Sequence, residues 1–470
     1  MYSTRRMSMG KRRRARQPAM WVTTTDLPTT AGHPFYARLN QLLRDHGFDD
    51  FAEAQCARFY ADTMGRPGLS PGIYFRLLLI GYFEGIDSER GIAWRAADSF
   101  ALRDFLGIDL HDAPPDHSTI SRTRRLIDLE THRAVFTWVL QCLSTAGLVK
   151  GKTVGIDATT LEANAALRSI VRRDTGESYE EFLTTLAKLS GIATPTRADL
   201  ARLDRHRKKK ASNDDWTHPH DPDAKITKMK DGRTHLAHKA EHAVDLETGA
   251  IVGITVQGAD EGDTTTIQET LPEAAEQLEA VAAVTDDTVA VIDEVVADKG
   301  YHSRTTVHDL EMLEIRTYIS EPDRGPQSWI DQEAERHAVY ANRRRIRGDR
   351  GKELLRTRGE LLERPCAHLY ETGGLRRVHV RGHENVRKRL LVHAGAFNLG
   401  LWMRTLFGIG TPRGLQGRLA ALAAVLSALW SLSCGAIGSV WRHIHRSTRS
   451  VGIDARIYCV IENATCTTGC

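Results

Sequence analysis

The first third of the chain has the apolar spacing of helices. Between residues 35 and 148 apolar side chains recur three or four positions apart, and one such run is Tyr74, Leu77, Leu78 and Tyr82. Gly and Pro interrupt the pattern at residues 66–68 and 113–115. The pattern predicts an all-helical region with breaks at these two places.

One predicted helix in this region carries a cluster of arginines. The polar residues 116–119 offer several possible caps to a helix over residues 120–127, which contains Arg122, Arg124 and Arg125. The segment could be the recognition helix of a helix-turn-helix, or a surface helix with ordinary cations.

Beyond Gly151 the apolar period changes to that of strands. Residues 153–156 form a short β-prone run that ends at Asp157, and residues 242–256 predict a hairpin with its turn at 247–249. Between them, the polar, Lys-rich residues 168–239 predict a solvent-exposed insertion with helical pieces around 179–189. The elements predicted next are a helix over 264–283, a strand over 289–297, a helix over 305–313, a strand over 315–319 and a mainly helical basic zone. This order predicts an α/β domain with a mixed sheet.

Composition adds size and charge. The chain has 470 residues, of which 41% are hydrophobic and 26% charged, so two to four folded domains are expected and a disordered chain is excluded. The net charge is only +4, but residues 336–389 hold sixteen Lys and Arg against six Asp and Glu. A basic zone of this kind suits nucleic-acid phosphates, although a solvated face is the alternative.

Cysteine use and targeting signals suggest a location. Seven scattered cysteines contain no CxxC pair, and the basic N-terminus is not followed by the apolar run of a secretory signal. We therefore expect the reducing cytoplasm. Residues 419–441 carry no formal charge, but their Ala, Ser and Gly content favours a buried or partner-facing helix over a membrane span.

Three acids are the candidates for chemistry. Asp157 and Asp298 each follow an apolar strand, where α/β sheets place ligands, although each could also cap a strand end or form a turn. Glu363 lies among arginines in the basic zone, where taken alone it could be an ion pair.

The segments around these acids resemble a known family. The matching segments are Gly155-Ile156-Asp157-Ala158-Thr159, Ala297-Asp298-Lys299-Gly300-Tyr301, and Glu363-Arg364-Pro365 followed by Glu371-Thr372-Gly373-Gly374. In this order they look like the three blocks of a DDE transposase from a bacterial insertion sequence. Residues 394–404 resemble the family's closing helix and 69–125 its N-terminal helical DNA-binding domain, so the resemblance covers about residues 35–407.

The resemblance implies a fold, a metal and a reaction. The fold is an RNase H-like mixed sheet flanked by helices, preceded by an all-α domain and followed by a helical tail. Asp157, Asp298 and Glu363 would be the catalytic and metal-binding residues of a two-magnesium site, with manganese possible. Water would attack the phosphodiester at each transposon end, and the freed 3′ hydroxyl would attack target DNA. Glu360, one helical turn earlier, is the competing third acid.

The resemblance also implies contacts with double-stranded DNA. Where many members of this family carry a Lys, seven residues after the glutamate, this chain has Tyr370, and Arg376, Arg377 and Arg381 are the candidates to replace it. The basic zone would bind phosphates, and the helix at 122–125 would read the ends. The phosphate contacts expected from the basic zone are Arg343, Arg344, Arg345 and Arg347. A transposase must join two ends, so a homo-oligomer, at least a dimer, is expected.

The domain hypothesis follows these boundaries: a basic tail (1–34), a helical DNA-binding domain (35–150), the catalytic domain (151–407) and a helical tail (408–470). Two other functions stay open, an inactive DNA-binding relic and another RNase H-like nuclease. Zinc binding by His235, His238 and His242 is disfavoured because neighbours in a strand face opposite ways. No Gly-rich phosphate loop is present, so no nucleotide cofactor is expected. We expect a nucleoid-associated protein of the cytoplasm without membrane contact.

Overall fold

The computed structural model describes residues 33–414 except 62–67, 110–111, 208–210, 286–291 and 326. The described residues up to 412 belong to one compact unit. The predicted basic tail at 1–34, apart from its last two residues, and the uncharged segment 419–441 lie outside the described residues. Among the described helices, none is long and apolar enough to cross a membrane.

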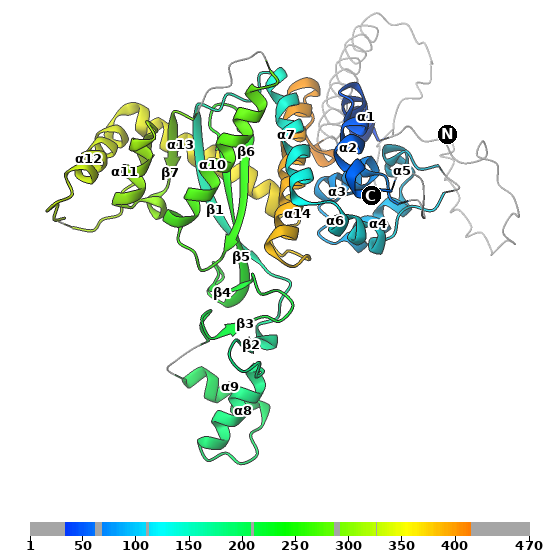
Figure 1. Cartoon of the computed structure of the whole chain (residues 1–470). Helices are drawn as coiled ribbons and strands as arrows, with labels where there is room; N and C mark the ends of the chain where they lie inside the picture. Colours follow the sequence, from blue (N-terminus) through cyan, green and yellow to red (C-terminus); the bar gives the residue numbers. More distant parts are fainter. Residues whose placement is uncertain are drawn as a thin grey trace, which may run out of the picture. The chain divides into compact units, whose positions relative to one another are not determined.

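The N-terminal part of this unit is helical, as predicted (Figure 1). Polar caps fix several of its helix starts, since Asp116 accepts a hydrogen bond from the Thr119 N–H and Asp128 from the Thr131 N–H. The helices are α1 (Pro34–Asp45), α2 (Phe48–Cys56), α3 (Pro71–Glu84), α4 (Glu89–Asp98), α5 (Phe100–Leu106), α6 (His117–Leu126) and α7 (Leu129–Thr145).

The second part contains the predicted mixed sheet, in the order β4-β5-β1-β7-β8, with β6 also paired to β5. Strand β5 is antiparallel to β1, β4 and β6, whereas β7 is parallel to both β1 and β8. The strands are β1 (Thr153–Glu162), β4 (Lys225–Lys228), β5 (Thr234–Asp245), β6 (Ile251–Gly258), β7 (Glu294–Ala297) and β8 (Arg316–Ile319). The predicted hairpin is therefore confirmed as β5–β6.

Helices cover both faces of the sheet. Helix α10 (Asp263–Ala282) packs on the face of β5 to which Glu241 points, because Thr266 of α10 donates a hydrogen bond to Glu241. The opposite face is covered by α13 (Asp349–Ala367) and α14 (His383–Phe407). Helices α11 (Arg304–Met312) and α12 (Glu333–Arg347) pack together beside β8. A π-helical turn, η5 (His368–Thr372), follows α13.

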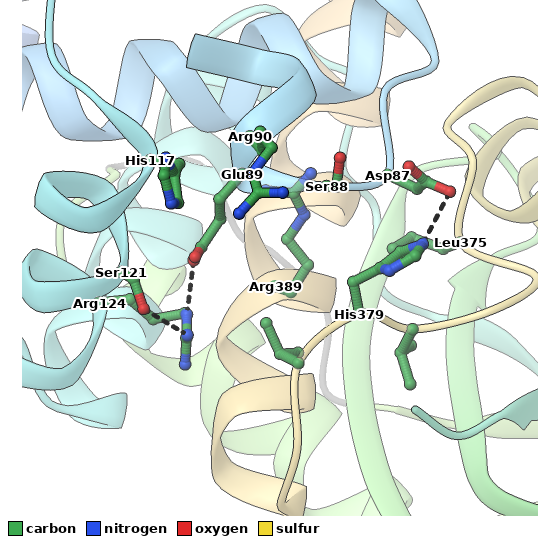
Figure 2. Close-up of a pocket in the computed structure, with 12 residues that line it drawn as sticks. Asp87, Ser88, Glu89, Arg90, His117, Ser121, Arg124, Leu375, His379 and Arg389 are labelled. Carbon is green, nitrogen blue, oxygen red and sulfur yellow. Dashed lines mark hydrogen bonds and ion pairs between the residues drawn. The ribbon is translucent and has the colours of Figure 1, made fainter. Parts of the chain in front are cut away.

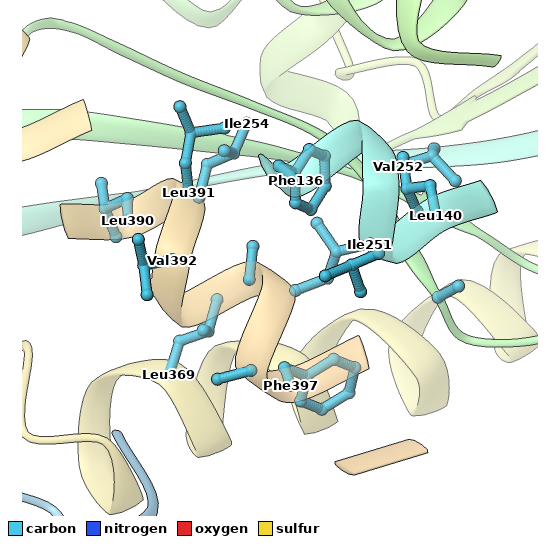
Figure 3. Packing of buried hydrophobic residues seen from close by; sticks show 14 of the residues in the cluster. Phe136, Leu140, Ile251, Val252, Ile254, Leu369, Leu390, Leu391, Val392 and Phe397 are labelled. Carbon is cyan, nitrogen blue, oxygen red and sulfur yellow. The ribbon is translucent and has the colours of Figure 1, made fainter. Parts of the chain in front are cut away.

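Helix α14 joins the two parts of the unit. Its apolar residues pack against α7 and β6, so one continuous cluster of buried hydrophobic side chains includes both the N-terminal helices and the sheet (Figure 3). The side chains around this junction include Phe136, Leu140, Ile251, Ile254, Leu390, Leu391 and Phe397. The helical region is thus held to the sheet by apolar burial.

Two predicted elements differ from the structure. Strand β1 does not end at Asp157 but continues to Glu162, because residues 157–162 pair with β5. The insertion at 168–239 is not simply an exposed stretch: it contains β2 (Val171–Arg172), α8 (Tyr179–Leu189), α9 (Arg197–His206) and β3 (Trp216–Thr217). Trp216 is buried there against Tyr179 and Phe182, which gives the insertion a small apolar cluster of its own.

Candidate active site

Asp157 and Asp298 lie on the same face of neighbouring parallel strands. Gly155 of β1 is level with Val296 of β7, and extending that register by two residues sets Asp157 level with Asp298. Because side chains alternate in a strand, residues 155 and 157 share a face, as do 296 and 298. The structure therefore brings these two predicted acids together at the point where the pairing of β1 with β7 ends.

This face is the one that α13 covers. A Cβ atom placed on Gly155 would lie 2.8 Å from Cδ1 of Leu362, so only a residue without a side chain allows α13 to pack this closely on β1. At the other end of the strands, the Glu294 carboxylate accepts a hydrogen bond from the Thr153 hydroxyl at 2.8 Å and is ion-paired with Arg350 of α13 at 2.5 Å.

Glu363 flanks the covered face of α13. Taking Leu362 as the residue that points at β1, a helix with 3.6 residues per turn places Glu363 about 100° and Glu360 about 160° from that direction. Burial, together with the charges of Asp157 and Glu363, raises the pKa of the Cys366 thiol to about 12. Both carboxylates therefore act on the same thiol. Glu363 therefore lies closer than Glu360 to the face that α13 turns toward β1.

Arg358 supplies the positive charge next to Asp157. Its Nη2 lies 3.2 Å from Oδ1 of Asp157, and the Arg358 side chain is only 15% exposed. Burial raises the pKa of Asp157, the Asp298 charge raises it further, and Arg358 and Lys230 counteract the rise. Two carboxylates that repel each other in a partly buried position are suited to a shared cation.

Asp298 is held by the turn that follows it. Its Oδ1 accepts a hydrogen bond of 2.8 Å from the Gly300 N–H. Tyr301, in the same turn, is buried, and its hydroxyl donates to Oε1 of the buried Glu241 at 2.7 Å. Burial raises the pKa of Glu241. The Tyr301 hydroxyl therefore anchors the Asp298 turn to β5.

No three His, Cys, Asp or Glu side chains within the described ranges lie close enough to hold one metal ion. The convergence of Asp157, Asp298 and Glu363 on a metal pair thus stays a prediction. The three histidines considered for zinc binding all lie on β5 and contact other side chains. His235 lies 3.1 Å from Asp231, and His238 lies 3.3 Å from Asp221. His242 is hydrogen-bonded to Tyr370.

Tyr370 lies seven residues after Glu363, where the resemblance predicts a lysine. The structure buries it, with its hydroxyl 2.5 Å from Nε2 of His242, so its side chain supports the covered face and does not reach solvent. Nearby, Arg376 pairs with Glu371, and Arg377 lies 3.7 Å from Glu162. Arg381 donates to the Asn164 carbonyl at 3.1 Å. All three of these arginines are exposed.

Some of the other predicted DNA contacts are exposed, and others are bound to neighbouring groups of the protein. On α6, Arg122 and Arg125 are exposed, but Arg124 is ion-paired with Glu89 at 2.8 Å and only 11% exposed, because it ties α6 to α4. The Arg124 side chain therefore stabilises the packing of α6 on α4.

The basic zone divides in the same way. On α12, Arg343 is bound to both carboxylate oxygens of Glu321, and Arg345 donates to the Thr317 carbonyl at 3.0 Å. Arg344 and Arg347 are exposed. Of the four arginines predicted to contact phosphate here, Arg344 and Arg347 therefore remain open to a DNA phosphate.

Sequence patterns did not single out Arg358, the Tyr301–Glu241 bond or the burial of Tyr370. Arg358 had one available signal, since it precedes Leu362 by four residues and so shares its helix face. The partners of the Tyr301–Glu241 contact are 60 positions apart in the sequence, and those of the Tyr370–His242 contact are 128 positions apart. Local sequence patterns carry no signal for such distant pairs.

Comparison with protein families agrees with this arrangement. Residues 25–126 match the transposase domain DUF772, and residues 213–399 match the transposase DDE domain. The chain belongs to the DDE transposases of insertion sequences. The sheet is accordingly RNase H-like, and the DDE match includes Asp298 and Glu363 while Asp157 precedes it. No curated protein matches the chain.

Proposed function

We propose that this transposase binds the terminal repeats of an insertion sequence, cleaves a DNA strand at each end and transfers the ends to a target. One observation carries the proposal: Asp157 and Asp298 share a face of adjacent strands, beneath the helix that presents Glu363. The family membership supports the same chemistry.

The donor set fits a hard divalent cation. Carboxylate oxygens are the ligands that Mg²⁺ and Mn²⁺ prefer. Burial and, to a lesser extent, the Asp298 charge raise the pKa of Asp157, and a bound cation would oppose both effects. Asp157 and Asp298 would hold it, with Glu363 as the third donor. When bound, a pair of such ions would supply Lewis-acid stabilisation of the attacking and leaving oxygens.

The chain's own residues prepare this site. The 2.8 Å bond from the Gly300 N–H orients Asp298, and the Tyr301 anchor fixes the turn beneath it. Arg358 places a guanidinium beside Asp157 and favours its ionised form. Leu362 over Gly155 excludes water from the strand face behind the two acids. These contacts keep the carboxylates oriented before DNA arrives.

DNA would lie on the exposed arginines. These are Arg122 and Arg125 on α6, Arg344 and Arg347 on α12, and Arg376, Arg377 and Arg381 before α14. We further propose an oligomer of at least two chains, since two transposon ends must be joined, and action on DNA in the cytoplasm.

The proposal is tested by cleavage of DNA carrying the inverted repeats that flank the coding region. The wild type should nick these ends with MgCl₂ or MnCl₂ and not with EDTA. Asp157→Asn and Asp298→Asn should each abolish nicking. Asp293→Asn, at the other end of β7, should retain it, because Asp293 lies away from the paired acids. Salt-sensitive DNA binding without cleavage would identify an inactive relic, and cleavage of RNA–DNA hybrid alone would identify another nuclease.

A further inference from the structure

A second charged site lies where the N-terminal helices meet α14. It is a pocket of about 390 Å³ (Figure 2). Its walls come from the start of α4, one face of α6, residues 375–380 and α14. None of its lining residues belongs to the carboxylate site described above.

Arg389 of α14 is the unusual member of this pocket. It is 5% exposed, and no carboxylate in the described part of the chain lies within ion-pairing distance of it. Its Nη2 donates to the Ile86 carbonyl at 3.1 Å, while its buried Nε has no hydrogen-bond partner. Burial lowers the pKa of Arg389 to about 10. A buried cation without a counter-ion is costly, so the fold leaves room here for an anion.

The acids of the pocket form no ion pair with Arg389, although the charges of Glu89 and Asp87 counteract part of the effect of burial on its pKa. Asp87 lies 2.9 Å from Nε2 of His379, and Glu89 is paired with Arg124. Arg90 is exposed and, in the residues that the structure describes, has no carboxylate partner. Two guanidinium groups of one pocket, those of Arg90 and Arg389, therefore form no ion pair with a carboxylate of the described residues.

The surrounding backbone adds to the positive potential. Helix α4 begins at the pocket with the neutral cap Ser88, so the positive end of its dipole lies there, whereas the Asp116 carboxylate already caps the start of α6. His117, Ser121 and Arg124 lie on successive turns of one face of α6 and all line the pocket. Figure 2 shows the Arg389 side chain rising from α14 toward the start of α4. Several donors around one space match the oxygens of a phosphate group.

We infer that this pocket holds one backbone phosphate of the DNA bound by α6, an inference that rests on the proposed DNA-binding function. Arg122 and Arg125 are exposed on the same helix whose pocket face carries His117 and Ser121. A phosphate in the pocket would fix the register of α6 on the duplex, since phosphate contacts position a protein while base contacts specify sequence. It would also link the DNA to α14, the helix that packs on the sheet.

The first test is the salt dependence of DNA binding. Arg90→Gln removes an exposed cation of the pocket, and Arg389→Lys keeps the charge but loses the forked donor geometry. Arg44→Gln is the matched control, because Arg44 is an exposed arginine of α1 outside the pocket. We expect Arg90→Gln to reduce the slope of log K against log salt by about 0.9, the value for one phosphate contact, and Arg44→Gln to leave it unchanged. Equal slopes for Arg90→Gln and the wild type would overturn the inference.

The second test locates the phosphate. Single methylphosphonate substitutions along the terminal DNA should reveal one position that weakens wild-type binding about tenfold, the loss of one charge-assisted contact. At that position, the methylphosphonate should weaken DNA binding by the Arg90→Gln and Arg389→Lys variants only slightly further, because these variants have already lost part of the phosphate contact. If the losses of binding free energy from the DNA substitution and the protein substitution added together at every position, the inference would be contradicted. Stabilisation of the wild type by inorganic phosphate, without any such position in the DNA, would assign the pocket to a free anion instead. Failure of the wild type to bind DNA at all would refute the proposed function itself.

Discussion

Gly155 offers the sharpest test of the proposal that α13 carries the third acid. In Gly155→Ala the added Cβ would lie 2.7 Å from Cδ2 of Leu246 and 2.8 Å from Cδ1 of Leu362. Real Cβ atoms do not approach carbon this closely, and both leucines are buried with little room to move. The substitution should therefore push α13 outward from β1.

The cost has two parts. Overpacking a well-packed core destabilises a protein by about 1–3 kcal/mol. The second part is catalytic, because Glu363 lies on the helix that moves while Asp157 lies on the strand that stays. A displacement of about 1 Å can lower the rate of a positioned reaction about 100-fold. The expected loss of nicking activity thus exceeds the loss of folded protein.

Urea unfolding and end-nicking, measured on the same preparations, separate the two parts. Gly359→Ala is the matched control, since a Cβ there meets nothing within 4 Å and Gly359 lies inside α13. It should gain about 0.5–1 kcal/mol from helix propensity and keep its activity. If Gly155→Ala lost activity only in proportion to its unfolded fraction, or lost none, the placement of α13 as the carrier of the third acid would be wrong.

Three further outcomes are expected. Glu363→Gln should abolish metal-dependent nicking and Glu360→Gln should retain it; the opposite result in the same assay would make Glu360 the third acid. Asp157→Asn should raise the melting temperature at neutral pH, with the gain vanishing toward about pH 4. The reason is that a raised carboxyl pKa stabilises the fold below its ordinary pKa, and this contribution is lost as pH rises through the raised value. If the melting temperature of Asp157→Asn, measured by scanning fluorimetry, exceeded that of the wild type by more at acid pH than at neutral pH, this reasoning would be refuted. Tyr301→Phe should cost about 1–3 kcal/mol in urea unfolding, because it removes a donor from the buried Glu241, and an unchanged midpoint would contradict the anchor.

Local patterns were sufficient for most helices and for the hairpin. The predicted helix at 264–283 corresponds to α10, and the helical piece at 179–189 to α8, because apolar period and capping residues are encoded within each segment. The positions of Asp157 and Asp298 next to paired strands also followed from motif and strand pattern. Their shared face required the register between β1 and β7.

The features that could not be predicted from the sequence depend on contacts between residues that are far apart in the chain. Strand β1 continues past Asp157 through small and polar residues that gain strand structure only by pairing with β5. Arg124 looked like a DNA contact because its partner, Glu89, lies 35 residues earlier on another helix. Arg389 was counted only as part of a basic zone, and its isolation from carboxylates depends on how α14 packs against α3 and α4.

The most direct test of the central claim is anomalous diffraction from crystals of the protein soaked in MnCl₂. We expect manganese density bound by carboxylate oxygens of Asp157 and Asp298, with Glu363 as a further ligand when DNA ends are present. Anomalous density elsewhere, with none between these two aspartates at a manganese concentration that supports nicking, would contradict it.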